Sequence, residues 1–162
     1  PAGTPNAMAV DAVGRTAYVG WFDSPSVGSS SVYAVALPHG GAPTLVAVLA
    51  GDILQLAVEE SGTIVAGTSG SPGLLRIDPA TLAVTHAHPT LGCCNAIEIE
   101  RATGDIFALS GCPAPGAYRV TPSGVGTFLF LPPLGYDETI PSGLAMHHDP
   151  AFYGSPTPAS EP

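Results

Sequence analysis

Three cysteines are the residues of this chain whose spacing most directly suggests chemistry. If residues 95–100 and 105–110 pair as a hairpin, the numbers of facing residues add to about 205, as those of Cys93 and Cys112 do. Cys94 lies one position away from this register. Facing positions in paired strands lie within the Cα separation that a disulfide spans. We therefore predict a Cys93–Cys112 disulfide, with Cys94 as the alternative partner of Cys112; the competing hypothesis is three reduced cysteines.

A disulfide would indicate an oxidising compartment, because such bonds persist in secreted proteins and are rare in the cytosol. The sequence therefore predicts an extracellular or secreted protein. The cysteine left over would be buried or would pair with another chain.

The remaining side chains with chemical potential are isolated from one another. Nothing in the sequence brings a histidine beside a cysteine, as a nucleophile and its base would require. Ser142 lies in Pro-Ser-Gly and lacks the Gly-x-Ser-x-Gly pattern of a nucleophile elbow. We therefore predict no catalytic residue. We expect His147 and His148 at a turn near one rim. Trp21 is expected near a loop, where a tryptophan either packs between blades or anchors a partner.

A sequence repeat determines where these residues lie. An apolar alternation, a turn and a second apolar run occur four times, beginning near residues 6, 54, 95 and 143. The equivalent apolar positions are Met8, Leu56, Ile97 and Leu144. They are 48, 41 and 47 residues apart, and a period of this size carried by strands is typical of β-propeller blades.

Each of the first three repeats divides into four expected strands. Their ranges are 7–11, 16–22, 31–37 and 44–49; then 54–59, 63–68, 73–78 and 81–87; then 95–100, 105–110, 116–121 and 126–131. The fourth repeat ends after its second strand. We predict an all-β fold, a partial β-propeller of about three and a half four-stranded antiparallel blades over residues 1–154. A Pro/Ser/Thr-rich tail follows over 155–162, extended or carrying O-linked sugar.

Such an incomplete ring leaves strand edges open. We expect the chain to be a piece of a longer propeller, or several chains to complete the ring together. Open edges also favour self-association.

The charge of the chain excludes two classes of partner. The net charge is −9, and the cations are four arginines with no lysine. Nucleic acids and anionic membranes are bound through clustered positive charge, which this chain lacks. No apolar stretch approaches the ~18 residues of a membrane-spanning helix, so we predict no membrane insertion. Arg76 and Arg119 recur at equivalent positions, and we expect both on exposed strand faces.

Three segments resemble a known group of propellers. Residues 4–19 and Pro141-Ser-Gly-Leu-Ala-Met146 are similar to the opening strands of NHL-type and SMP-30/gluconolactonase-like blades. Leu74-Leu-Arg-Ile-Asp-Pro-Ala-Thr81 resembles the third strand and turn of such blades. The resemblance covers roughly residues 4–154, and it implies a propeller fold more strongly than any one activity.

In the lactonase-like members of this group, residues just before the first strands hold a divalent metal. Asn6 and Asn95 fit that place, with Leu54 or Gln55 and then Ser142 in the other repeats. A hard cation such as Ca²⁺ prefers several oxygen ligands that include carboxylates, and two amides fall short of that set. We therefore predict no cofactor, with Ca²⁺ or another divalent metal as the alternative.

The combined features predict a non-catalytic extracellular module that binds a protein or glycan partner or assembles with itself. One alternative is a metal-dependent, lactonase-like hydrolase completed by residues outside this segment. The other is a subunit of a filament or polymer, because open edges can propagate contacts without closure. The candidate binding residues are Asn6, Trp21, Asn95, Ser142, His147 and His148.

Overall fold

The computed structural model describes residues 3–24, 28–38, 41–112 and 115–130. All regular secondary structure in this part of the chain is β-strand. The predicted fourth repeat and the tail lie outside the described residues, and so do Ser142, His147 and His148.

The described strands form three four-stranded antiparallel sheets, and each follows chain order. Sheet 1 contains β1 (Thr4–Asp11), β2 (Thr16–Ser24), β3 (Ser29–Ala36) and β4 (Thr44–Ala50). Sheet 2 contains β5 (Ile53–Val58), β6 (Ile64–Thr68), β7 (Leu74–Ile77) and β8 (Val84–His88). Sheet 3 contains β9 (Gly92–Ile99), β10 (Ile106–Cys112), β11 (Gly116–Val120) and β12 (Gly126–Phe130).

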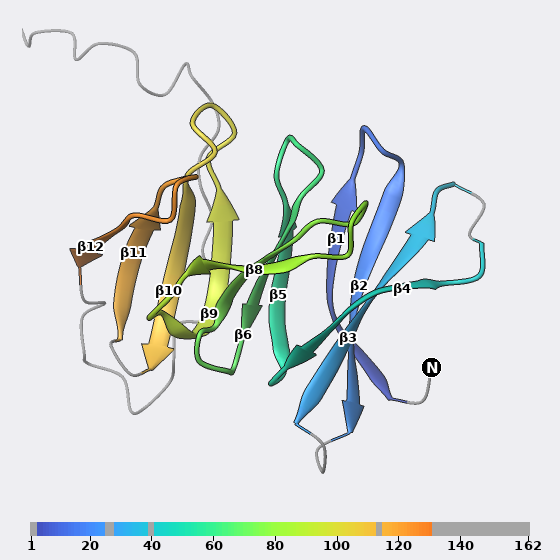
Figure 1. Ribbon diagram of the computed structural model, residues 1–162, viewed down its shortest axis with the longest axis horizontal. Coiled ribbons are helices and arrows are strands. Elements are labelled where there is room, and N and C mark those ends of the chain that lie inside the picture. The colour runs from blue at the N-terminus through green and yellow to red at the C-terminus, as the bar shows by residue number, and fades with distance from the viewer. Residues whose placement is uncertain (1–2, 25–27, 39–40, 113–114, 131–162) are drawn as a thin grey trace, which may run out of the picture.

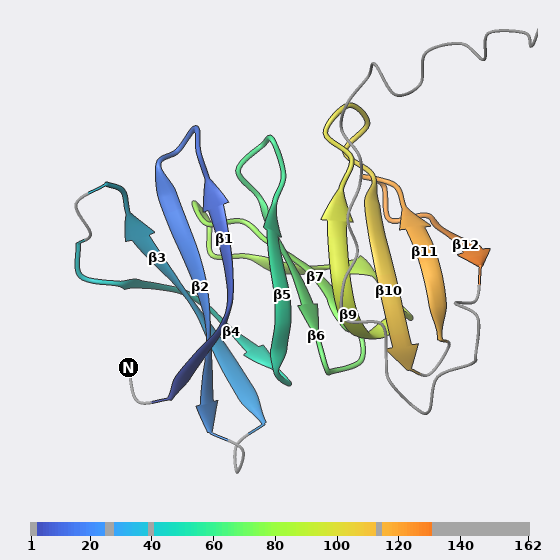
Figure 2. The ribbon, with the colours of Figure 1, turned by 180° about the vertical axis from the view of Figure 1, so that it is seen from behind.

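The three sheets stand face to face in a row (Figures 1 and 2). The first strands of the sheets are neighbours in space, since β1 contacts β5 and β5 contacts β9. The last strands, β4, β8 and β12, form the opposite edges. This arrangement confirms the prediction of an all-β partial propeller with one sheet for each of the first three repeats.

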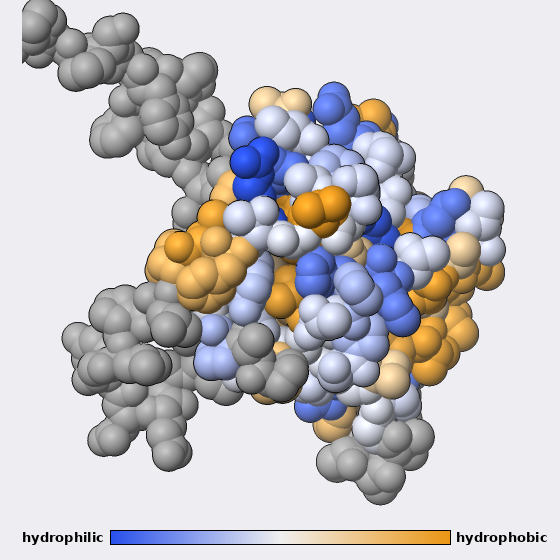
Figure 3. Space-filling model, turned by 60° about the vertical axis from the view of Figure 1, so that its left-hand side comes forward, coloured by the Kyte–Doolittle hydropathy of each residue, from blue (hydrophilic) through white to orange (hydrophobic). Residues whose placement is uncertain are grey.

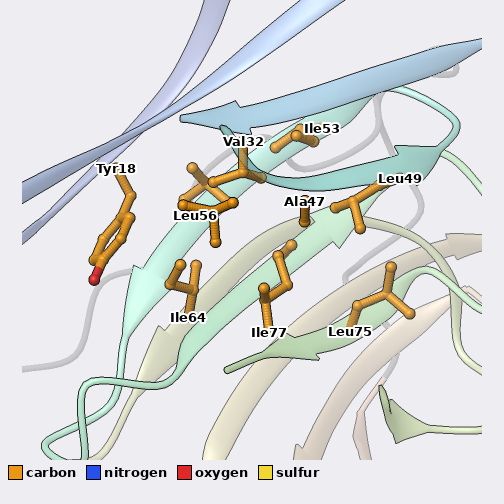
Figure 4. Close-up of a cluster of buried hydrophobic side chains, with 11 residues drawn as sticks. Tyr18, Val32, Ala47, Leu49, Ile53, Leu56, Ile64, Leu75 and Ile77 are labelled. Carbon is orange, nitrogen blue, oxygen red and sulfur yellow. The ribbon is translucent and has the colours of Figure 1, made fainter. Parts of the chain in front are cut away.

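Apolar side chains fill the space between consecutive sheets. Between sheets 1 and 2, Val32 and Leu49 meet Leu56, Ile64 and Ile77, all of them buried (Figure 4). A second buried cluster joins sheets 2 and 3. Each fully buried leucine or isoleucine contributes about 1.5–3 kcal/mol, so the sheet-to-sheet contacts hold the stack together.

Strand β8 begins three residues later than the sequence predicts. The range 81–87 was expected from alternation, whereas β8 begins at Val84. The Asp78 carboxylate accepts bonds from the Thr81 hydroxyl at 2.7 Å and from the Ala80 N–H at 2.8 Å, and these bonds hold a turn together. The Thr81 hydroxyl bond in turn lowers the pKa of Asp78. Leu82 closes the turn with a φ of 60°, which no strand residue adopts.

Each first strand carries an irregularity near its start. The register with the second strand shifts between Pro5 and Ala7 in sheet 1 and between Ile53 and Gln55 in sheet 2. In sheet 3 the shift leaves Asn95 unpaired. A β-bulge of this kind takes a residue out of the ladder and re-aims its side chain.

Candidate functional site

The bulge of β1 turns Asn6 toward the next sheet. Its Nδ2 donates to the carbonyl of Ile53 in β5 at 2.5 Å. A side chain of the first strand in one sheet is therefore bonded to the backbone of the first strand in the next. The side chain remains exposed at this rim.

Gln55 makes the corresponding link from sheet 2 to sheet 3. Its Nε2 donates to the carbonyl of Ile97 at 2.9 Å, and its Oε1 accepts from the Ile97 N–H at 2.9 Å. The two bonds pair the side chain with the backbone of β9 much as another strand would. From the sequence, Gln55 is only one of two candidate equivalents of Asn6, because the bulge that separates Leu54 from Gln55 leaves no signature in the sequence.

Asn95 stands at the equivalent bulge of sheet 3. Its Nδ2 is buried and has no hydrogen-bond partner. A buried donor without a partner is costly and calls for a physical explanation.

The described residues hold no group of three or more His, Cys, Asp or Glu side chains that could bind a metal. The amide nitrogen of Asn6 is engaged with Ile53, whereas that of Asn95 has no hydrogen-bond partner. Metal binding by these asparagines, and the hydrolase that would depend on it, stay predictions.

A disulfide joins Cys93 and Cys112, whose Cα atoms are 5.2 Å apart. The predicted pair is confirmed, but the register differs from the one used to predict it. The bulge at Asn95 places Cys112 opposite Gly92. Cys93 reaches its partner with a φ of 44°, in the region that favours glycine.

The third cysteine, Cys94, is free and buried. Burial raises the pKa of its thiol to about 12, because an apolar surrounding disfavours the thiolate. This side chain acts as a small apolar residue in the packing between sheets 2 and 3.

Trp21 lies near the end of β2 and is only half-buried. Its ring meets Tyr33 edge-on, with 6.5 Å between centroids. The indole Nε1 is buried without a hydrogen-bond partner. Trp21 therefore lies on the surface of sheet 1. It is close to the end of β2, and the sequence predicts a loop after this strand end.

The face of sheet 1 that points away from sheet 2 is apolar and open. Facing residues of paired strands share a side of the sheet, and one such row runs through Met8, Val19, Tyr33 and Leu45. A second row joins Trp21, Ser31 and Val48. We call this surface the open face of sheet 1.

Several of its side chains are largely exposed to solvent. The exposed fractions are 66% for Met8, 60% for Val48, 49% for Val10 and 48% for Leu45. Figure 3 shows apolar surface gathered toward both sides of the stack in that view. Contiguous exposed apolar surface on a soluble domain marks an interaction site. The sequence does not indicate this surface, because Met8 has the same apolar character as its covered equivalents Leu56 and Ile97.

Both recurrent arginines are paired with acids. Arg119 lies on an exposed face as predicted, with 48% of its side chain exposed, whereas Arg76 is largely covered, which corrects the prediction for that residue. Arg76 Nε donates to Glu59 at 2.8 Å, and its Nη1 donates to the Pro122 carbonyl of sheet 3 at 3.2 Å. Arg119 Nε donates to the buried Asp105 at 2.6 Å. Only 15% of the Arg76 side chain is exposed, because sheet 3 covers the side of sheet 2 on which it lies.

A cleft of about 310 Å³ lies at the opposite rim, between the turns that follow β5 and β9. Its lining includes Glu59, Glu60, Arg101 and Thr103. Glu59 is already bound to Arg76, and the mixed charges give no preference for an ion. We assign no function to this cleft.

Comparison with solved structures finds the same arrangement of sheets in a chain from the crystal structure of a nidogen/laminin complex. The two chains are 20% identical with a TM-score of 0.68, and the match covers 83% of this chain and 51% of that one. The fold is that of a β-propeller. The present chain spans about half the length of its structural neighbour.

A second likeness is to the extracellular domain of a hybrid two-component system from B. thetaiotaomicron. It is 11% identical with a TM-score of 0.37, covers 80% of this chain and 22% of that one, and is too remote to bear on the fold. Neither a family model nor a curated protein sequence matches the chain. No helix among the described residues is long and apolar enough to span a membrane.

Proposed function

We propose that this chain is a non-catalytic, extracellular β-propeller module that binds protein through the open face of sheet 1, and that a second copy of the chain is a partner for this face. The observation that carries the proposal is the exposure of Met8, Val10, Leu45 and Val48 on one side of a sheet. Burying such side chains is favourable by about 1.5–3 kcal/mol each.

The repeats indicate what kind of surface fits there. Leu56 and Ile97 occupy the position of Met8 in the other two sheets, and both pack against the preceding sheet. Met8 therefore stands at a position that elsewhere joins one sheet to another. Another β-sheet with an apolar face is the matching partner.

The chemistry of the face favours a protein over a glycan. The rows described above contain apolar, aromatic and hydroxyl side chains, and among the described residues the one acid bonded to them is Asp23, which accepts from the Ser31 hydroxyl at 2.6 Å. Apolar and aromatic residues are typical of the core of a protein interface. The neighbour in the nidogen/laminin complex supports a protein partner by analogy of fold.

The disulfide supports the extracellular assignment, because such bonds are rare in reducing compartments. The blade type proposed is NHL-like, on the resemblance of the opening strands. If a second copy were to use a different face, the contact would repeat without closing and would form a filament.

Sedimentation velocity of the full chain over a range of concentrations tests the proposal. We expect reversible association, weakened by more than about tenfold in Met8→Asp and in Val48→Asp, because a buried charge costs more than 1.4 kcal/mol. Val13→Asp is the matched control, since Val13 is 91% exposed in the β1–β2 turn, away from the face. A monomer at every concentration, or equal effects of all three changes, would contradict the proposal.

A further inference from the structure

The outer face of sheet 3, which points away from sheet 2, carries a buried donor without a partner. In sheets 1 and 2 an amide near the start of the first strand bonds to the backbone of the next first strand: Asn6, at the bulge, to Ile53, and Gln55, one position beyond the bulge residue, to Ile97. In sheet 3 the amide is Asn95, whose Nδ2 has no hydrogen-bond partner. Asn95 Nδ2 therefore lacks the backbone carbonyl that accepts the hydrogen bond of the amide in the other two sheets.

We propose that the outer face of sheet 3 is a docking site for residues 141–148 of this chain, anchored by Asn95. The repeat makes Pro141 the equivalent of Ile53, the residue that accepts from Asn6. The carbonyl of Pro141 is then the acceptor for Asn95 Nδ2. Residues 143–148 supply the next first strand.

The chain outside the described residues is long enough to reach this site. β12 ends at Phe130 at the far edge of sheet 3, which leaves ten residues before Pro141. The way back to β9 crosses three strand spacings, about 15 Å. Ten extended residues span up to about 33 Å, so the return needs no change in the sheet.

Within residues 143–148, every second side chain would point toward the outer face of sheet 3, and the first two of these, Leu144 and Met146, are apolar. Leu144 is equivalent to Leu56 and Ile97, both of which pack on the preceding sheet. Met146 follows two positions later and points the same way on a strand. Ala145 between them points away, and its equivalent in β9 is the charged residue Glu98.

The docking face has an apolar row beside the bulge, and the next row on the same face contains Glu98, Phe107 and Arg119. Ala96, Leu109 and Ala117 form one cross-strand row and a buried cluster separate from the packing against sheet 2. Small side chains at two of the three positions leave room for Leu144 and Met146. An apolar strand would cover this row.

The site differs from its counterparts at one position. Gly20 and Gly67 lie where a side chain would collide with the next first strand, whereas sheet 3 has Leu109 at the equivalent place. We therefore expect the docked strand to lie farther from β10 than β9 lies from β6.

Methionine labelling of the full chain tests this inference, because Met8 and Met146 are its only methionines. In a Val48→Asp background, which keeps the open face of sheet 1 uncovered, a soluble paramagnetic agent should relax the Met146 methyl several-fold less than the Met8 methyl. Equal relaxation of the two methyls would overturn the docking. The result does not depend on self-association, so it is separate from the test of the proposed function.

Two substitutions at adjacent positions then test which side chains of the docked strand face sheet 3. Leu144→Asp should expose Met146, whereas Ala145→Asp, with the same charge one position on, should leave it protected. Asn95→Ala should lower the ratio of docked to undocked molecules by about fivefold, which is the effect of losing one hydrogen bond. Equal effects of Leu144→Asp and Ala145→Asp, or no effect of Asn95→Ala, would contradict the assigned register and anchor.

Discussion

At the scale of single residues, the three cysteines have three different environments. Cys93 and Cys112 are bonded, and Cys94 is buried with a thiol pKa raised to about 12. The raised pKa means that the thiol stays protonated in the folded chain up to strongly alkaline pH. The thiolate is the reactive form, so the folded protein should be inert to thiol reagents.

A thiol count checks this. Without reductant, we expect no rapidly reacting thiol in the native chain, one after unfolding and three after unfolding with reduction, since the sequence has three cysteines. Raising the pH from 9.0 toward 12 should destabilise the fold, because the unfolded thiol ionises first. A native thiol that reacts rapidly at neutral pH would refute the assignment.

The cysteine pair also shows how much of a disulfide can be predicted from a hairpin register. The hairpin register of 95–100 with 105–110 identified the bonded pair, and the strands do pair in that register as far as Leu109 and Ala96. Beyond that point the bulge shifts the register by one residue, and Cys93 bonds to Cys112 from a backbone φ of 44°. A bulge has no reliable sequence signal, so the pair was predictable and its geometry was not.

At the scale of elements, amide side chains bond β1 to β5 and β5 to β9. Gln55→Ala removes both bonds to Ile97 and leaves its N–H and carbonyl without that partner. We expect a loss of about 2 kcal/mol in the free energy of unfolding, at about 1 kcal/mol for each bond. Asn6→Ala removes a single bond at an exposed side chain and should cost less.

Urea unfolding of the two variants measures the difference. Equal losses for Gln55→Ala and Asn6→Ala would show that the second bond of Gln55 contributes nothing. Retention of full stability by Gln55→Ala would show that the amide series does not hold the sheets together.

The strands themselves were largely predictable, because period-two alternation bounded by Gly, Pro and Asp is a strong local signal. The ranges 44–49 and 126–131 differ from β4 and β12 by one residue at one end. The start of β8 was missed because the side-chain bonds of Asp78 extend the turn. Side-chain capping of turns competes with a strand in a way that alternation does not reveal.

At the scale of the whole molecule, the stack of three sheets has two end faces, and each has an unsatisfied feature. The open face of sheet 1 exposes Met8 and Val48, while the outer face of sheet 3 contains the unpaired donor of Asn95. The repeat period predicted the architecture, since equivalent positions recur about every 40–50 residues. It could not say which faces lack a neighbour, because equivalent residues have the same sequence character whether or not a sheet covers them.

The most direct measurement of the central claim, that the open face of sheet 1 binds protein, is the methyl signal of Met8 as the concentration of the full chain is raised. Met8 is 66% exposed in the single chain. We expect its methyl resonance to shift and to become protected from a soluble paramagnetic agent as copies associate, and neither change should occur in Val48→Asp. A Met8 signal that stays accessible while sedimentation shows association would mean that the copies meet through another surface, and the account would be wrong.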